Sequence, residues 1–102
     1  MKYFVQIDVG IEQGNHMERS GGPGPMMGRF IETFEPEALF MALDRRAMFM
    51  IADLDEIKMA QVMAVAAHMG GNYPTVVPVA AADAFGPLFA QAMPGAFAIL
   101  DE

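Results

Sequence analysis

Cysteine and tryptophan are both missing from this chain, and basic residues are few. Without cysteine there is no disulfide, no thiolate nucleophile and no thiolate metal ligand, and the sequence is compatible with a reducing compartment. Six Lys and Arg residues against 13 Asp and Glu residues give a formal net charge of −7. Nucleic-acid binding draws most of its affinity from cations that neutralise phosphates, so we expect no nucleic-acid partner.

A long uninterrupted apolar run is also missing. Residues 76–100 are very apolar, but Asp83, Gly86, Gln91 and Pro94 interrupt them, whereas a membrane-spanning helix needs about 20 predominantly apolar residues. Residues 1–9 form a short alternating segment without the basic region and cleavage site of a secretory signal. We therefore expect a cytoplasmic protein without a membrane partner.

Hydrophobic side chains, in contrast, are abundant. They make up 54% of the 102 residues, above the usual range of about 45–50%. The length allows a single domain, residues 1–102, and a domain this small buries only a limited fraction of its surface. The excess of hydrophobic residues therefore favours association with a second copy of the chain.

The hydrophobic pattern predicts an α+β fold. Residues 2–9 alternate as in a strand with one apolar and one mixed face, and two apolar segments, 39–43 and 47–51, predict a hairpin. Residues 73–79 predict an edge strand, because Pro74 and Pro78 cannot donate to a ladder. Helical spacing predicts helices over 25–34 and 53–69, and Asp53 with Glu56 resembles a capping box at the start of the second one.

Two segments complete the predicted organisation. Residues 10–24 are polar and rich in glycine, which predicts a loop that is either a lid or disordered. Residues 80–102 predict a C-terminal helix and tail. In that region Pro94-Gly95 is expected to stop the helix, and residues 97–100 to add a short strand.

The predicted order is the ferredoxin-like βαββαβ plan with an extra C-terminal helix. Because its strands are apolar on both faces, helices on one side leave a hydrophobic face that we expect a partner sheet to cover. Short runs of the sequence resemble the dimeric α/β barrel superfamily, and in particular small uncharacterised bacterial proteins related to muconolactone-isomerase-like and antibiotic-biosynthesis-monooxygenase-like domains. These runs are Pro36-Glu37-Ala38 through Phe40, Arg45-Arg46-Ala47-Met48-Phe49, Asp53-Leu54 and Val77-Pro78-Val79.

The resemblance implies a homodimer whose two sheets enclose a barrel. In the superfamily, such a barrel can hold a small apolar or aromatic molecule, and its enzymes include isomerases and cofactor-free monooxygenases. The alternative is a non-catalytic structural or accessory module that serves only dimerisation. We expect no cofactor in either case.

The mixed face of the first strand supplies the main ligand-binding candidates. If Val5 and Ile7 pack on the helices, then Gln6 and Asp8 point, beside Phe4, into the space between the sheets, where a few polar groups in an apolar cavity are typical of a small-molecule site. Alternatively, Asp8 lies in water and Gln6 hydrogen-bonds across the interface. Two further candidates are Phe49, on the strand expected at the interface, and Arg46, whose guanidinium suits a carboxylate.

The residues able to move a proton, if the protein is an enzyme, are Asp8, His68 and Tyr73. His68 alternatively interacts with the free carbonyls at the end of its helix. We expect no metal site, because His16 with its acidic neighbours has no closed ligand pattern. The 11 methionines include soft ligands for Cu(I) in principle, but their spread over helices and strands favours filling of the core.

Overall fold

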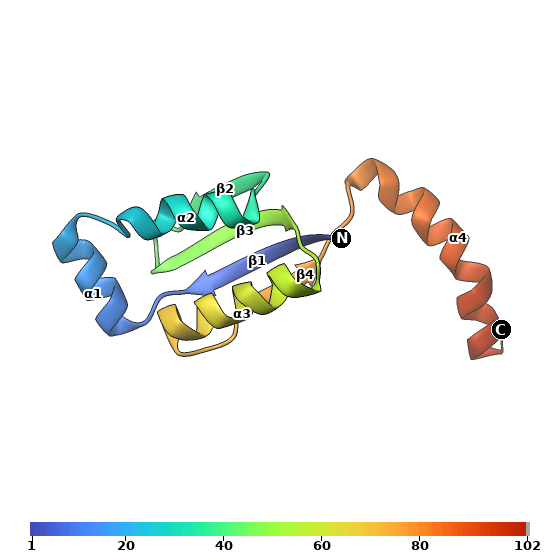
Figure 1. The fold of residues 1–102 in the computed structure, drawn as a ribbon. Coiled ribbons are helices and arrows are strands. Elements are labelled where there is room, and N and C mark those ends of the chain that lie inside the picture. Colours follow the sequence, from blue (N-terminus) through green and yellow to red (C-terminus); the bar gives the residue numbers. More distant parts are fainter. Residues whose placement is uncertain (102) are drawn as a thin grey trace.

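One antiparallel sheet organises the chain in the computed structural model, which describes residues 1–101 (Figure 1). The four strands lie in the order β2-β3-β1-β4, and the helices between them pack on one face. The fold is therefore α+β, as the sequence predicts. The elements are β1 (Lys2–Asp8), α1 (Ile11–Ser20), α2 (Pro25–Phe34), β2 (Ala38–Met41), β3 (Ala47–Asp53), α3 (Glu56–Gly70), β4 (Thr75–Pro78) and α4 (Ala82–Leu100).

The pairing of the strands is compatible with the ferredoxin-like plan. β1 lies between β3 and β4 and is antiparallel to both, while β2 pairs only with β3. β4 is thus an edge strand, as Pro78 within it and Pro74 just before it predict, because its unpaired side needs no donor.

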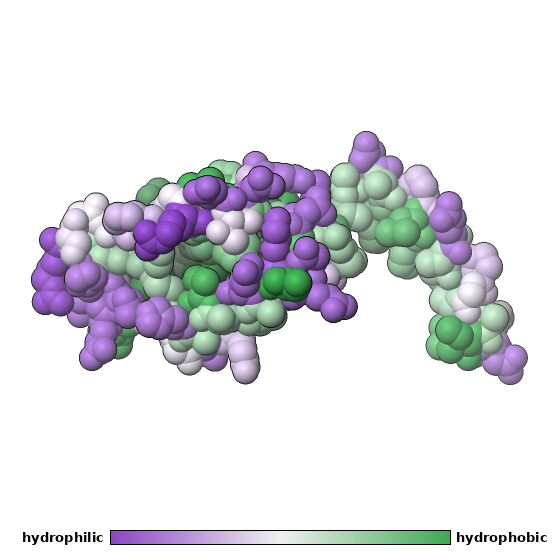
Figure 2. Space-filling view, viewed as in Figure 1, coloured by the Kyte–Doolittle hydropathy of each residue, from purple (hydrophilic) through white to green (hydrophobic). Residues whose placement is uncertain are grey.

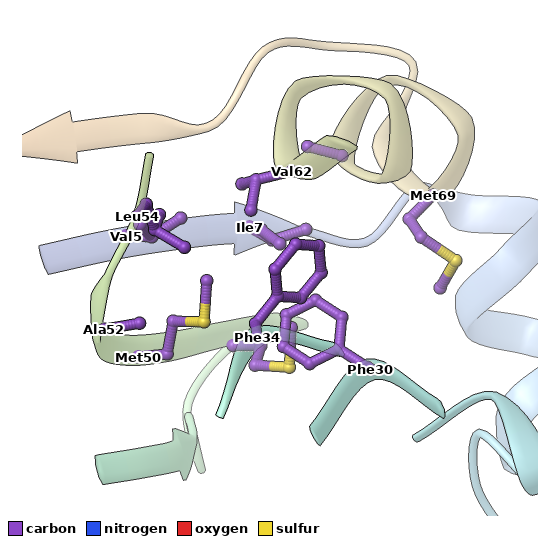
Figure 3. Close-up of a cluster of buried hydrophobic side chains, with 11 residues drawn as sticks. Val5, Ile7, Phe30, Phe34, Met50, Ala52, Leu54, Val62 and Met69 are labelled. Atoms are coloured by element: carbon purple, nitrogen blue, oxygen red, sulfur yellow. The ribbon is translucent and has the colours of Figure 1, made fainter. Parts of the chain in front are cut away.

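The core lies between the sheet and the helices α2 and α3 (Figure 3). Val5 and Ile7 of β1 are 0% and 2% exposed, and they meet Met50 of β3 there. The predicted alternation of β1 is therefore confirmed, with Tyr3, Val5 and Ile7 toward the helices. From the helices, the core takes Phe30, Phe34, Val62, Ala66 and Met69.

The first turn of α3 is capped by Asp55, not by the predicted box of Asp53 and Glu56. The Asp55 carboxylate accepts a hydrogen bond of 2.8 Å from the Lys58 backbone N–H, which satisfies one of the free donors at a helix start. Asp53 instead ends β3 and lies 3.4 Å from the N-terminal ammonium group. The sequence pattern was displaced by two residues because β3 runs on to Asp53.

Asp55→Ala is expected to lower the free energy of unfolding by about 1 kcal/mol, because it removes the cap of α3. In a domain of this size, that corresponds to a melting temperature about 4–8 °C lower. Thermal unfolding followed by circular dichroism measures the shift. Asp53→Ala is the matched control and should change the stability by less than about 0.5 kcal/mol. Equal losses from the two variants would contradict the assignment of the cap.

The segment predicted as a loop, residues 10–24, contains the helix α1, so this prediction was wrong for Ile11–Ser20. Glycine was taken as a sign of a loop, but Gly14 is the buried residue of α1. A Cβ at Gly14 would lie 2.6 Å from Cδ of Arg46, so the glycine allows α1 to approach that side chain closely. Only the tight turn after α1 follows the prediction, since Gly21, with φ of 82°, ends the helix in the left-handed region.

The C-terminal helix α4 extends away from the rest of the molecule (Figure 1). It is predicted correctly in kind but is longer than expected, because it continues through Pro94 to Leu100 and leaves no strand at 97–100. None of its residues, all of which the structure describes, is buried. The radius of gyration is 17.2 Å, against about 13 Å for a compact domain of this length. The surface of α4 is largely apolar (Figure 2).

In the part of the chain that the structure describes, no helix combines the length and the hydropathy needed to cross a bilayer.

Candidate functional site

The face of the sheet opposite the helices is apolar and aromatic. Cross-strand register places Phe4 beside Ile51 and Phe49 beside Phe40, and directly paired residues share a face of a sheet. The rings of Phe4 and Phe49 stack with centroids 5.9 Å apart and planes inclined by 24°. Phe40 is 65% exposed. We call this surface the open face, defined by Phe4, Gln6, Phe40, Phe49, Ile51 and Val77.

A polar group borders the open face at the end of β1. Gln6 pairs with Phe49 in the register, and its Nε2 donates a 3.1 Å hydrogen bond to Oδ1 of Asp8. The sequence predicted a common face for Phe4, Gln6 and Asp8 of this strand, and the register adds Phe49 to that face. What the face contacts beyond the single chain stays a prediction.

Arg45 adds a cation near this polar group. Its guanidinium donates two hydrogen bonds, of 3.1 and 2.9 Å, to the carboxylate of Asp44. The bonded Asp44 carboxylate raises the pKa of Arg45, with a smaller contribution from the charge of Asp8, and the same hydrogen bonding lowers the pKa of Asp44. Arg45 therefore stays charged, and it places positive charge near Asp8 at this end of the sheet.

Arg46, the remaining predicted ligand-binding residue, lies on the helix side instead. Its Nη2 donates to Oδ1 of Asn15 at 3.0 Å, and its Nη1 donates to the Ile11 carbonyl at 3.3 Å. It also pairs with the carboxylate of Glu18, Nη2 to Oε1, at 3.0 Å. The guanidinium therefore attaches α1 to the start of β3, and the structure does not bring it to Phe4 and Phe49.

The three residues predicted to move protons do not form one cluster. Asp8 borders the open face, whereas His68 lines a groove between α2 and α3 on the helix side. Tyr73 lies in the turn after α3 and is 78% exposed. The structure thus supplies no pair among these residues for concerted acid–base chemistry. No group of three or more His, Asp or Glu side chains among residues 1–101 is arranged to hold a metal ion.

Sequence reasoning missed a cavity on the helix side. It measures about 210 Å³ and lies beneath α1 and α2 at one end of the sheet. Six methionines from five elements line it, namely Met17, Met26, Met27, Met41, Met48 and Met69. The signal in the sequence was the high methionine content, but these residues are scattered along the chain, and α1 was expected to be a loop.

The fold and these two surfaces define the class of the protein as a small α+β protein with a four-stranded antiparallel sheet that is compatible with the ferredoxin-like plan. Comparisons with protein-family models, with curated proteins and with solved structures found no match to this chain. Functional conclusions therefore rest on the chemistry of its own surfaces.

Proposed function

We propose that this protein acts as a homodimer of the dimeric α/β barrel type, which binds a small apolar or aromatic molecule between the open faces of its two sheets. The observation that carries the proposal is the open face itself, with the Phe4–Phe49 stack bordered by the hydrogen-bonded pair of Gln6 and Asp8. Contiguous exposed apolar patches of this kind typically mark interaction or ligand sites. A few polar groups beside an apolar surface are the usual means of orienting a small ligand.

The chemistry of the face favours binding over catalysis. The hydrogen-bond partner of Asp8 is an amide, which cannot serve as an acid or a base at neutral pH. His68 and Tyr73 lie elsewhere. The arrangement supports recognition of a ring, with one hydrogen bond to a hydroxyl or amine of the ligand.

The open face is too small to form the whole interface of a stable dimer. β1 and β3 have seven residues each, and β2 and β4 have four each. At about 3.3 Å per residue and about 4.8 Å per strand, the face covers roughly 350 Å², whereas a stable dimer usually buries about 800 Å² per partner. A further apolar surface is needed, and α4 supplies one with Phe85, Leu88 and Phe89, which are each more than half exposed.

The second candidate function is a non-catalytic assembly module, and α4 is the observation that favours it. α4 has 19 residues, and none of them is buried within its own chain. Most helical stability in proteins comes from tertiary packing, so α4 lacks the contacts that would stabilise it in an isolated chain. In an assembly module, α4 forms most of the interface. Side chains of the partner then cover the whole open face and leave no space for a ligand.

Asp8→Asn is expected to separate the two functions. 1-Naphthol has a hydroxyl for the Asp8 carboxylate and naphthalene has none, so the variant should weaken 1-naphthol binding about 10-fold and leave naphthalene binding unchanged. Isothermal titration calorimetry measures both affinities. The melting temperature should stay within about 2 °C of the wild type, because Asp8 is exposed. Absence of saturable binding of either compound to the wild type would contradict a ligand site on the open face.

A further inference from the structure

The geometry points to a second binding site, the cavity lined by methionines, which would take a small uncharged apolar molecule about the size of a substituted benzene. This site lies on the opposite side of the sheet from the open face. It is complete within one chain, and the proposal does not depend on the dimer.

The walls of the cavity are apolar and adaptable. Ile7, Val9 and Val65 add to the apolar lining made by the six methionines, and the charged residues of the lining are Glu18, Arg45 and Arg46. Methionine side chains have three rotatable bonds and polarisable sulfur atoms, and they suit surfaces that adjust to ligands of varied shape and contact aromatic rings favourably. Six of the 11 methionines of the chain gather here.

The charges at the rim are already paired. Glu18 bonds to Arg46 at 3.0 Å, and Arg45 bonds to Asp44 at 2.9 Å. Among the described residues, no buried side-chain nitrogen or oxygen lacks a hydrogen-bond partner. The charged side chains at the rim therefore already have partners, and the apolar walls favour an uncharged occupant.

The volume decides the size of the ligand. An apolar cavity of about 150 Å³ in an engineered protein stays dry and binds benzene, and this cavity measures about 210 Å³. The cavity is partly open to solvent, and its apolar lining offers a water molecule few of the two to four polar partners that it needs. A benzene ring with one or two additional apolar groups fills the space without displacing α1.

A path into the cavity exists along the helix layer. A second hollow, between α2 and α3, measures about 440 Å³ and shares Met26, Val65 and Met69 with the first. Figure 2 shows the surface hollowed between these two helices. The cover, α1, is held by contacts of Arg46, in which exposed ion pairs contribute only about 0–1 kcal/mol, and by Met17, which packs against the core. The cavity is itself partly open to solvent, so a ligand can enter and leave.

The test uses the methionines as reporters. Protein labelled with ¹³C at the methionine methyl groups is titrated with toluene, and with benzoate as the matched anion. Toluene is expected to shift the signals of Met17, Met26, Met27, Met48 and Met69 saturably and to leave those of Met59, Met63 and Met93 in place. Benzoate is expected to shift none of them. Uniform or non-saturating shifts, or equal binding of benzoate, would overturn the proposal.

Two filled variants, Met17→Trp and Met27→Trp, test the location of the site. Both positions are partly exposed, so a larger side chain can be accommodated, and either variant should weaken toluene binding at least 10-fold. Phe49→Asp changes the open face and should leave toluene binding at these methionines unchanged. If Phe49→Asp abolishes the methionine shifts and the filled variants do not, the ligand lies on the open face and the second site is refuted.

Discussion

Gly70→Ala is expected to lower the free energy of unfolding by about 3 kcal/mol and the melting temperature by about 10–20 °C. A Cβ at Gly70 would overlap the Asp8 carbonyl oxygen and lie 3.1 Å from the Asp8 carbonyl carbon. These are backbone atoms at the end of β1, so no rotamer change relieves the overlap. The last turn of α3 must move away from β1, and the packing of Ala66 and Met69 is lost with it.

The same contact joins the end of β1 to α3 by a hydrogen bond. The Gly10 N–H donates to the Met69 carbonyl oxygen at 2.9 Å. This bond satisfies one of the free carbonyls at the end of α3, and it keeps the two segments close. Displacement of the helix therefore costs this bond in addition to the apolar contacts.

Gly28→Ala is the matched control for Gly70→Ala. Gly28 lies inside α2, and no described atom lies within 4 Å of the position of its Cβ. Alanine there should raise the stability by about 1 kcal/mol, because glycine is a poor helix former. Chemical denaturation measures both variants. A stability of Gly70→Ala within about 1 kcal/mol of the wild type would show that α3 and β1 are not in such close contact.

Phe49→Asp is expected to convert the proposed dimer to a folded monomer. Phe49 is half-buried and lies outside the buried core, so the substitution should spare the fold of the single chain. In a dimer through the open face, it places an unpaired carboxylate in the interface, which costs about 3 kcal/mol or more, or at least a 100-fold weaker association. Sedimentation velocity over a range of concentrations measures the change.

Two further variants identify the surface that forms the dimer. Ile57→Asp changes a residue of α3 that is 72% exposed and should leave the association intact. Phe89→Asp changes α4. If Phe89→Asp dissociates the protein while Phe49→Asp does not, the assembly module formed through α4 replaces the barrel as the explanation. A wild-type monomer at all concentrations would exclude both forms of the proposal.

Local patterns predicted the elements whose signals lie within a few residues. The alternation of β1 follows directly from Val5 and Ile7, and the edge position of β4 follows from Pro74 and Pro78. The predictions of secondary structure were wrong where the conformation depends on more than the neighbouring residues. Glycine predicts a loop at Gly14, yet Gly14 lies in the helix α1, where the absence of a Cβ leaves space for Arg46, 32 positions away. Pro94 predicts the end of a helix, but α4 continues past it.

The candidate sites divide in the same way. Phe4, Gln6 and Asp8 belong to one strand, so their common face could be predicted from its period of two residues. Phe49 belongs to β3, and the pairing of β3 with β1 places it on the same face. The sequence could not assign Arg46 to one face of the sheet. Arg46 lies just before β3, and its side chain is directed by its partners on α1. The cavity lined by methionines required five elements to converge, and no spacing along the chain encodes that.

The sequence by itself determined the α+β class, the order of the strands along the chain and the two apolar faces of the sheet, because these depend on local periodicity and on the positions of prolines and glycines. The tertiary structure alone decided that α1 exists, that Arg46 attaches it, and that six methionines surround one cavity. It also decided that α4 stands away from the sheet. These features depend on contacts between segments far apart in the chain. Such contacts stabilise the protein only once the fold brings the segments together, so local sequence patterns do not reveal them.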